Sequence, residues 1–317
     1  MPRRRRGVGP HELTESADGR CVPTAPAVVA SGPFAHAHDS PRTAPAGPVP
    51  RIASRLVAEP VSVLPCDTRQ HVLTTAEFDV LWEWLGLGPT PVVLQLASPG
   101  RTHAERRAVQ AAAWQGLRER AVAGPDGPDP ELARLLHLLA RPAEQLELRA
   151  WWGHEVRVLG GGQHGAGALA QREADSVTVT ACGSLPSAFL GAFPPADRGP
   201  GRACTVPSAV LTAAPVTELR PALIGAGVPS GEAALLTTMV TGTRRRAQVV
   251  ALGADRWGVL RRAGGVLGVL DGPRGRYLLT RSTGEDGVEW ATIAPVDDRQ
   301  LRHRIADLLS TAVTAAT

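Results

Sequence analysis

The segment most like a catalytic loop is a glycine-rich stretch in the middle of the chain. Residues Gly160–Gly167 read GGGQHGAG and follow an alternating apolar segment around Val156, as a nucleotide-binding loop follows a strand. Such a loop holds phosphate at the N-terminus of the helix that comes next. Here a second alternating segment follows around Leu169, which predicts another strand. The stretch is therefore interpreted as a flexible turn between two strands.

Basic chemistry in this chain depends entirely on arginine. All 34 basic residues are Arg, and no Lys occurs. A GxxxxGK[ST] phosphate loop, a Schiff-base lysine and a Ser-x-x-Lys nucleophile all need a lysine amine. The sequence excludes these three chemistries.

Other nucleophiles and ligands lack the partners that would activate them. Ser184 has no GxSxG context and is better placed to begin a helix. His154 lies in a turn beside two tryptophans, and the pair Asp297-Asp298 is explained by a helix start. We expect no enzyme activity, no cofactor and no metal site.

Cysteine usage points to a reducing compartment. None of the four cysteines forms a CxxC pair, and they are Cys21, Cys66, Cys182 and Cys204. Neither a disulfide framework nor a zinc site is indicated. No apolar run approaches the roughly 20 residues that span a bilayer. We expect a cytoplasmic protein with no membrane partner.

The net charge of +4 is unevenly placed. Residues 1–70 hold 9 Arg against 6 acidic residues, so the rest of the chain is nearly neutral. An Arg-rich nucleic-acid-binding protein is the alternative function. Phosphate neutralisation needs a local basic excess, which disfavours this alternative for the folded part.

The chain divides into a tail and a folded region. Residues 1–58 contain nine prolines and no sustained periodicity, which predicts a disordered Arg- and Pro-rich tail. Its His36 and His38 could ligate a metal, but no further ligand is near. Order is expected from about residue 59, with a short strand over 61–64.

Capping signals predict the first helices. Thr74 or Thr75, Thr102 and Asp129 each precede a helical apolar pattern, and Glu105 completes a capping box with Thr102. The apolar run Pro91–Leu96 predicts a strand between the first two helices.

Two antiparallel meanders follow, and together they indicate a repeat. Alternating apolar residues occupy 145–180 and again 246–293, with Asp271-Gly272 among the expected tight turns. Helical segments over 208–241 are expected to break at Pro215, Pro221 and Pro229. The order helix, meander, helix thus occurs twice. It predicts an α+β fold with one quasi-twofold antiparallel sheet, in halves of about 59–206 and 207–317.

From about Leu73 to the C-terminus the chain resembles the EspG family of proteins associated with type VII (ESX) secretion. No single motif is diagnostic; the ordered set of four segments carries the resemblance. They are Leu73–Leu85, Ser98–Arg120 with the helix that ends at Pro142, Arg198–Leu211, and Gly275–Pro295.

The resemblance implies a central antiparallel sheet flanked by helical bundles, and a chaperone without catalysis or cofactor. Family members bind PE–PPE-type helical heterodimers in the cytosol and deliver them to the ESX machinery. Their contacts come from the sheet, from a loop between early strands and from a C-terminal helical bundle. The matching positions here are Trp151–Glu155 and about Pro207–Gly242, while the long tail departs from the family pattern.

The expected binding patch is apolar with a basic rim, as suits the tip of a helical client. Because adjacent strand residues face opposite sides, one of the two tryptophans is expected to face solvent, and Trp152 is preferred. The helical leucines and methionine could equally be core residues. The predicted patch consists of Trp151, Trp152, His154, Leu235, Leu236, Met239, Arg244 and Arg245.

Overall fold

The structure is a computed structural model that describes residues 69–317. The predicted disordered tail 1–58, the strand expected over 61–64, and Cys21 and Cys66 lie outside the described residues. No helix among residues 69–317 is long and apolar enough to cross a membrane.

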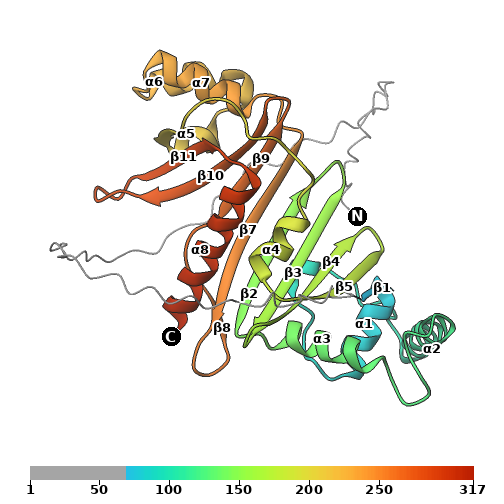
Figure 1. The fold of residues 1–317 in the computed structure, drawn as a ribbon. Coiled ribbons are helices and arrows are strands. Elements are labelled where there is room, and N and C mark those ends of the chain that lie inside the picture. The colour runs from blue at the N-terminus through green and yellow to red at the C-terminus, as the bar shows by residue number, and fades with distance from the viewer. Residues whose placement is uncertain (1–68) are drawn as a thin grey trace, which may run out of the picture. The chain divides into compact units, whose positions relative to one another are not determined.

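One antiparallel sheet of eleven strands organises the fold (Figure 1). Its order is β1-β5-β4-β3-β2-β7-β9-β10-β11-β6, and β8 pairs with the C-terminal end of β7. This confirms the predicted antiparallel meanders. The strands are β1 (Gln70–Thr74), β2 (Glu144–Trp151), β3 (Glu155–Gln163), β4 (Ala166–Glu173), β5 (Ser176–Cys182), β6 (Cys204–Pro207), β7 (Arg245–Ala254), β8 (Leu260–Arg262), β9 (Leu267–Gly272), β10 (Gly275–Thr283) and β11 (Glu289–Pro295).

Helices precede and follow each meander. The first meander lies between α3 and α4, and the second between α7 and α8. The helices are α1 (Thr75–Trp84), η1 (Val92–Leu94), α2 (His103–Glu119), α3 (Pro130–Ala140), α4 (Leu185–Gly191), α5 (Ser208–Ala213), η2 (Val216–Glu218), α6 (Leu219–Gly225), α7 (Ser230–Val240) and α8 (Asp298–Ala316).

The strand order repeats around a central seam, which confirms the quasi-twofold sheet. In each half a lead strand pairs with the last strand of the meander: β1 with β5, and β6 with β11. The two halves meet where β2 pairs with β7. Because β6 pairs within the second set of strands, we propose that the halves divide just before Cys204, slightly earlier than expected.

Side chains close the helix starts as the local sequence predicts. Thr74 and Glu77 form a reciprocal capping box on α1, Thr102 does so with Glu105 on α2, and Asp297 with Gln300 on α8. Each box satisfies backbone N–H groups that the first turn leaves without a partner. Asp129 caps α3 without a reciprocal box, because its side chain alone accepts from the Glu131 and Leu132 N–H groups, and Pro130 takes the first helical position.

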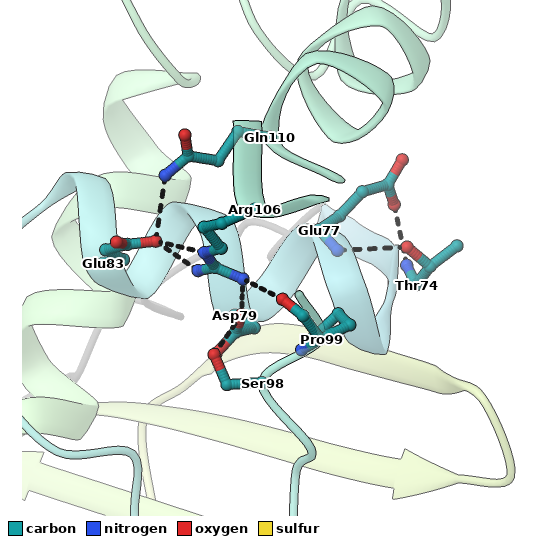
Figure 2. Close-up of polar contacts among 8 residues, drawn as sticks. All are labelled: Thr74, Glu77, Asp79, Glu83, Ser98, Pro99, Arg106 and Gln110. Carbon is teal, nitrogen blue, oxygen red and sulfur yellow. Dashed lines mark hydrogen bonds and ion pairs between the residues drawn. The ribbon is translucent and has the colours of Figure 1, made fainter. Parts of the chain in front are cut away.

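An arginine of α2 holds α1 in place (Figure 2). The Arg106 guanidinium donates to the Asp79 carboxylate at 2.6 Å, to the Pro99 carbonyl at 3.2 Å and to Glu83. The Asp79 side chain is only 9% exposed, so this arginine supplies the charge that its burial requires. The hydrogen bond from Arg106 holds the pKa of Glu83 below its ordinary value. These contacts tie together two of the segments that resemble the EspG family.

Three apolar clusters divide the core between the two faces of the sheet. The first lies between the central strands and α4 with α8. The second joins α1, η1, α2 and α3 to the strands of the first half, and the third joins α6 and α7 to β6, β10 and β11. Neither the second nor the third includes a residue of β2 or β7.

Three local predictions were wrong. The run Pro91–Leu96 forms the 3-10 helix η1, in which the consecutive residues Val93 and Leu94 are both buried. Pro221 lies in the first turn of α6 and does not break it, because a proline there loses no helical hydrogen bond. Asp271-Gly272 ends strand β9, and the turn is formed by the next two residues, 273–274.

Candidate partner-binding face

Alternation along β2 separates a covered face of the sheet from an open one. Leu146, Leu148 and Ala150 point into the cluster beneath α4 and α8. The residues between them point the other way, because side chains alternate across a strand. Of these, Arg149 and Trp151 are exposed and Glu147 is half-buried.

The neighbouring strand β7 continues this surface. In the antiparallel register Trp151 lies opposite Arg246, Arg149 opposite Gln248, and Glu147 opposite Val250. We call this surface the open face; it consists of Glu147, Arg149, Trp151, Arg246, Gln248, Val250 and Leu252. It lies on the seam where β2 pairs with β7 (Figure 1), and neither of the two helical clusters on this side of the sheet includes a residue of these strands.

Arginines of β3 and β4 hold the 3-10 helix η1, which borders the open face on the side of the first half. Arg172 donates to the Leu94 carbonyl at 2.9 Å, and Arg157 donates to the Gln95 side chain at 3.2 Å. Both contacts fasten η1, which packs against β2 and β3. Val92 on η1 is 79% exposed, so it adds an exposed apolar side chain to this border.

The open face mixes apolar and charged groups. Trp151 is 46% exposed and supplies the largest apolar surface, with Val250 and Leu252 half-buried on the next strand. Arg149 and Arg246 are the exposed cations, and the Glu147 carboxylate accepts a hydrogen bond from Gln145 at 2.9 Å. Such a surface suits the burial of an apolar partner tip with polar contacts around it.

The structure reverses the expectation for the two tryptophans. Trp152 points to the covered face, where its ring lies 5.5 Å from that of Phe193. Trp151 is the one that faces solvent. His154 is exposed in the β2–β3 turn, with Nε2 at 3.2 Å from the carboxylate of Glu173, the last residue of β4. His154 thus lies at the end of the open face.

The helical members of the predicted patch do not lie on the surface. Leu236 is completely buried and Met239 is 2% exposed, both within the cluster around β6 and β10. Leu235 packs against the same cluster and is half-buried. The prediction of Leu236 and Met239 as surface contacts was wrong because α7 covers its own half of the sheet. Arg244 is exposed and Arg245 is half-buried on the covered side.

The open-face residues that the prediction missed are Glu147, Arg149, Arg246, Gln248, Val250 and Leu252. The signal was present in the polar members of the alternating segment QLELRAW. The leucines of that segment predict a face that packs on the core. Its polar residues alternate with them, and they indicate that the other face of the strand is uncovered.

The other chemical candidates have structural explanations. The stretch 160–167 contains the expected turn between two strands, but the turn is limited to His164-Gly165, and Gly160 and Gly161 lie inside strand β3. A Cβ on Gly160 would lie 2.5 Å from the Phe189 ring, and one on Gly161 would lie 2.9 Å from the Leu138 carbonyl. Glycine therefore lets α4 and α3 pack closely on the two faces. Ser184 begins α4 without capping it, and its hydroxyl donates to Ser187 at 3.3 Å.

Within 69–317 no group of three or more His, Cys, Asp or Glu side chains could hold a metal ion. Burial, reinforced by Glu144, raises the pKa of the Cys182 thiol to about 11. Cys182 and the buried Cys204 are both free thiols.

A two-part antiparallel sheet with helices on both faces defines an α+β fold and by itself no particular chemistry. The chain matches the EspG family over residues 74–307, and it belongs to that family. No curated protein sequence matches it.

A solved structure with a similar fold is the Mycobacterium tuberculosis type VII secretion system chaperone EspG5 in complex with the PE25-PPE41 dimer. The sequences are 16% identical, and the TM-score is 0.60. The match covers 77% of this chain and 96% of the EspG5 chain. The two proteins share the fold.

Proposed function

We propose that this protein is a cytosolic chaperone of a type VII secretion system, and that it binds a helical substrate of the PE–PPE type. Membership of the EspG family supports this function, as does the fold shared with EspG5, which was solved with a PE25-PPE41 dimer. The observation that carries the proposal is the open face, an uncovered strip of sheet at the seam.

The client contacts the open face through its apolar tip. Burial of a large apolar side chain contributes about 1.5–3 kcal/mol before the costs of association are subtracted. Trp151, Val250 and Leu252 together offer enough apolar surface for a stable complex that can still dissociate. Arg149 and Arg246 orient the client through polar contacts at the edge of this surface.

Co-expression of the full chain with PE- and PPE-like proteins encoded nearby tests the proposal. A soluble complex is expected, and Trp151→Ala is expected to weaken it by about 2 kcal/mol, roughly thirtyfold. Arg149→Glu should also weaken it. Trp257→Ala is the matched control, because Trp257 is 76% exposed in the turn after β7, at the other end of the seam. The proposal would be contradicted if Trp257→Ala lost binding while Trp151→Ala kept it, or if none of the candidate proteins formed a complex.

A further inference from the structure

A second concave surface lies on the covered side of the sheet, away from the open face. It is a cavity of about 370 Å³ where β7 begins, bordered by the linker after α4 and by the β9–β10 turn. Arg245 reaches it because it shares the orientation of Ala247 and Val249, which face α8. The open-face residue Arg246 points the opposite way. We call this cavity the arginine pocket.

Three arginines line the arginine pocket: Arg244, Arg245 and Arg274. Within residues 69–317 none of the three forms an ion pair. Two carboxylates also line the pocket, those of Asp197 and Asp271. The second is already neutralised, because Arg276 binds both of its oxygens at 2.8 and 2.9 Å. The pocket therefore carries a net positive charge.

The pocket walls are fixed by backbone contacts. The Arg244 N–H donates to the Asp271 carbonyl at 2.9 Å, which holds the start of β7 against β9. The Arg276 N–H donates to the Asp197 carbonyl at 2.7 Å, and the Arg276 guanidinium donates to the Pro194 carbonyl at 2.6 Å. A partner therefore meets a preformed site and orders little backbone on binding.

The chemistry of the lining favours carboxylates over nucleic acid. Among the described residues no aromatic side chain lines the pocket, so these residues offer no platform on which bases could stack. Its residues come from strands, a turn and a linker, and a phosphate site would more commonly use a helix N-terminus. Guanidinium groups bind carboxylates through paired, charge-assisted hydrogen bonds.

We infer that the arginine pocket binds an acidic peptide segment of a second protein partner. Charge complementarity identifies this occupant: three arginines that have no ion-pair partner within residues 69–317 line the pocket beside one carboxylate, Asp197, that is not neutralised there. The pocket and the open face lie on opposite sides of the sheet, so both can be occupied at once. The inference does not depend on which client the open face binds.

The test uses the full chain and a fluorescein-labelled peptide of eight glutamates, followed by fluorescence anisotropy. We expect saturable binding that weakens with salt, and we expect Arg245→Glu with Arg274→Glu to weaken it about tenfold. The matched control is Arg262→Glu with Arg304→Glu, which makes the same charge change at exposed arginines on β8 and α8. Thermal unfolding checks that both double variants are folded.

Three outcomes would overturn the inference. The first is no saturable binding of the glutamate peptide. The second is an equal loss of binding in the control variant, which would make the attraction a general charge effect. The third is displacement of the labelled peptide by pyrophosphate, or by an oligothymidylate of equal charge, at a lower concentration than unlabelled peptide requires. That result would make the pocket a phosphate site. A loss of client binding to the open face would leave the peptide result unchanged, so the two proposals fail separately.

Discussion

Arg276 and Asp271 form a bidentate ion pair in the protein interior. Nε of Arg276 lies 2.8 Å from Oδ1 of Asp271, and Nη2 lies 2.9 Å from Oδ2. The arginine side chain is 1% exposed and the aspartate 7%. The same guanidinium lies over the Phe193 ring and donates to Asp298 at the start of α8. One arginine therefore connects β9, β10, α8 and the linker between the two halves.

Removal of Arg276 is expected to be strongly destabilising. Arg276→Met leaves the buried Asp271 carboxylate without a counter-charge, which costs about 3–5 kcal/mol of unfolding free energy. Denaturant unfolding measures this change. Asp298→Asn is the control, because the Asp298 side chain is 54% exposed and its pairing contributes less than about 1 kcal/mol. Equal effects of the two substitutions would contradict the central role of Arg276.

Trp152→Ala is expected to reduce stability. The indole packs against Phe193 and the cluster beneath α4 and α8, so its removal leaves a cavity that costs about 3 kcal/mol. Trp151→Ala should change the unfolding free energy by less than about 1 kcal/mol, because its ring is 46% exposed. The opposite order of the two midpoints in thermal unfolding would show that the strand register is wrong.

Leu236→Asp is expected to unfold the second half of the protein. It places a carboxylate in a fully buried apolar cluster, where neither an ion pair nor water is available. We expect little soluble protein and loss of the cooperative unfolding transition. Thr238→Asp on the same helix is the comparison, since Thr238 is exposed and should tolerate the change. A soluble, cooperatively folded Leu236→Asp protein would contradict the burial of α7.

The ion pair between Glu83 and Arg106 predicts a pH dependence of stability. The hydrogen bond from Arg106 lowers the pKa of Glu83 from 4.5, so the stabilisation is present above that value and is lost as the pH falls through the lowered pKa. Because the Glu83 side chain is 51% exposed, the contribution is about 0.5–1 kcal/mol. The difference in unfolding free energy between wild type and Glu83→Gln should therefore be present at pH 6 and shrink below about pH 4. Glu285→Gln, at an exposed turn, should show no such trend.

Cys182 is expected to react slowly with iodoacetamide. With a pKa of about 11, its thiol remains protonated near neutral pH, and the alkylation rate should rise about tenfold per pH unit up to that value. Peptide mass spectrometry measures the rate. Glu144→Gln removes a nearby negative charge, lowers the pKa of Cys182 and should accelerate the reaction. A rate equal to that of the denatured chain would contradict the burial of this thiol.

Local signals were sufficient to predict most elements. The capping boxes at Thr102 and Asp297 and the Asp129-Pro130 start depend only on residues a few positions apart, so the sequence shows them directly. Alternating apolar residues likewise predicted the meanders. A short apolar run such as 91–96 is ambiguous, because a buried 3-10 turn and a buried strand have the same composition.

The site was harder to predict because it depends on long-range pairing. Whether Trp151 or Trp152 faces solvent is set by the register of β2 with β7, which are separated by about a hundred residues in the sequence. The burial of Leu236 depends on β6 and β10, whose position relative to α7 no local pattern reports. The surface is uncovered because neither of the two groups of helices on that side of the sheet packs over β2 and β7.

The seam between β2 and β7 has a consequence for how the chain associates. An isolated first half would end in an eight-residue strand, β2, whose backbone N–H and C=O groups on the side of β7 would lack a partner. Such an edge can pair antiparallel with the same strand of a second copy. Joining the halves in one chain raises the effective concentration of the correct strand above that of any free copy. The linker after α4 therefore favours pairing of β2 with β7 of the same chain over pairing with a second copy.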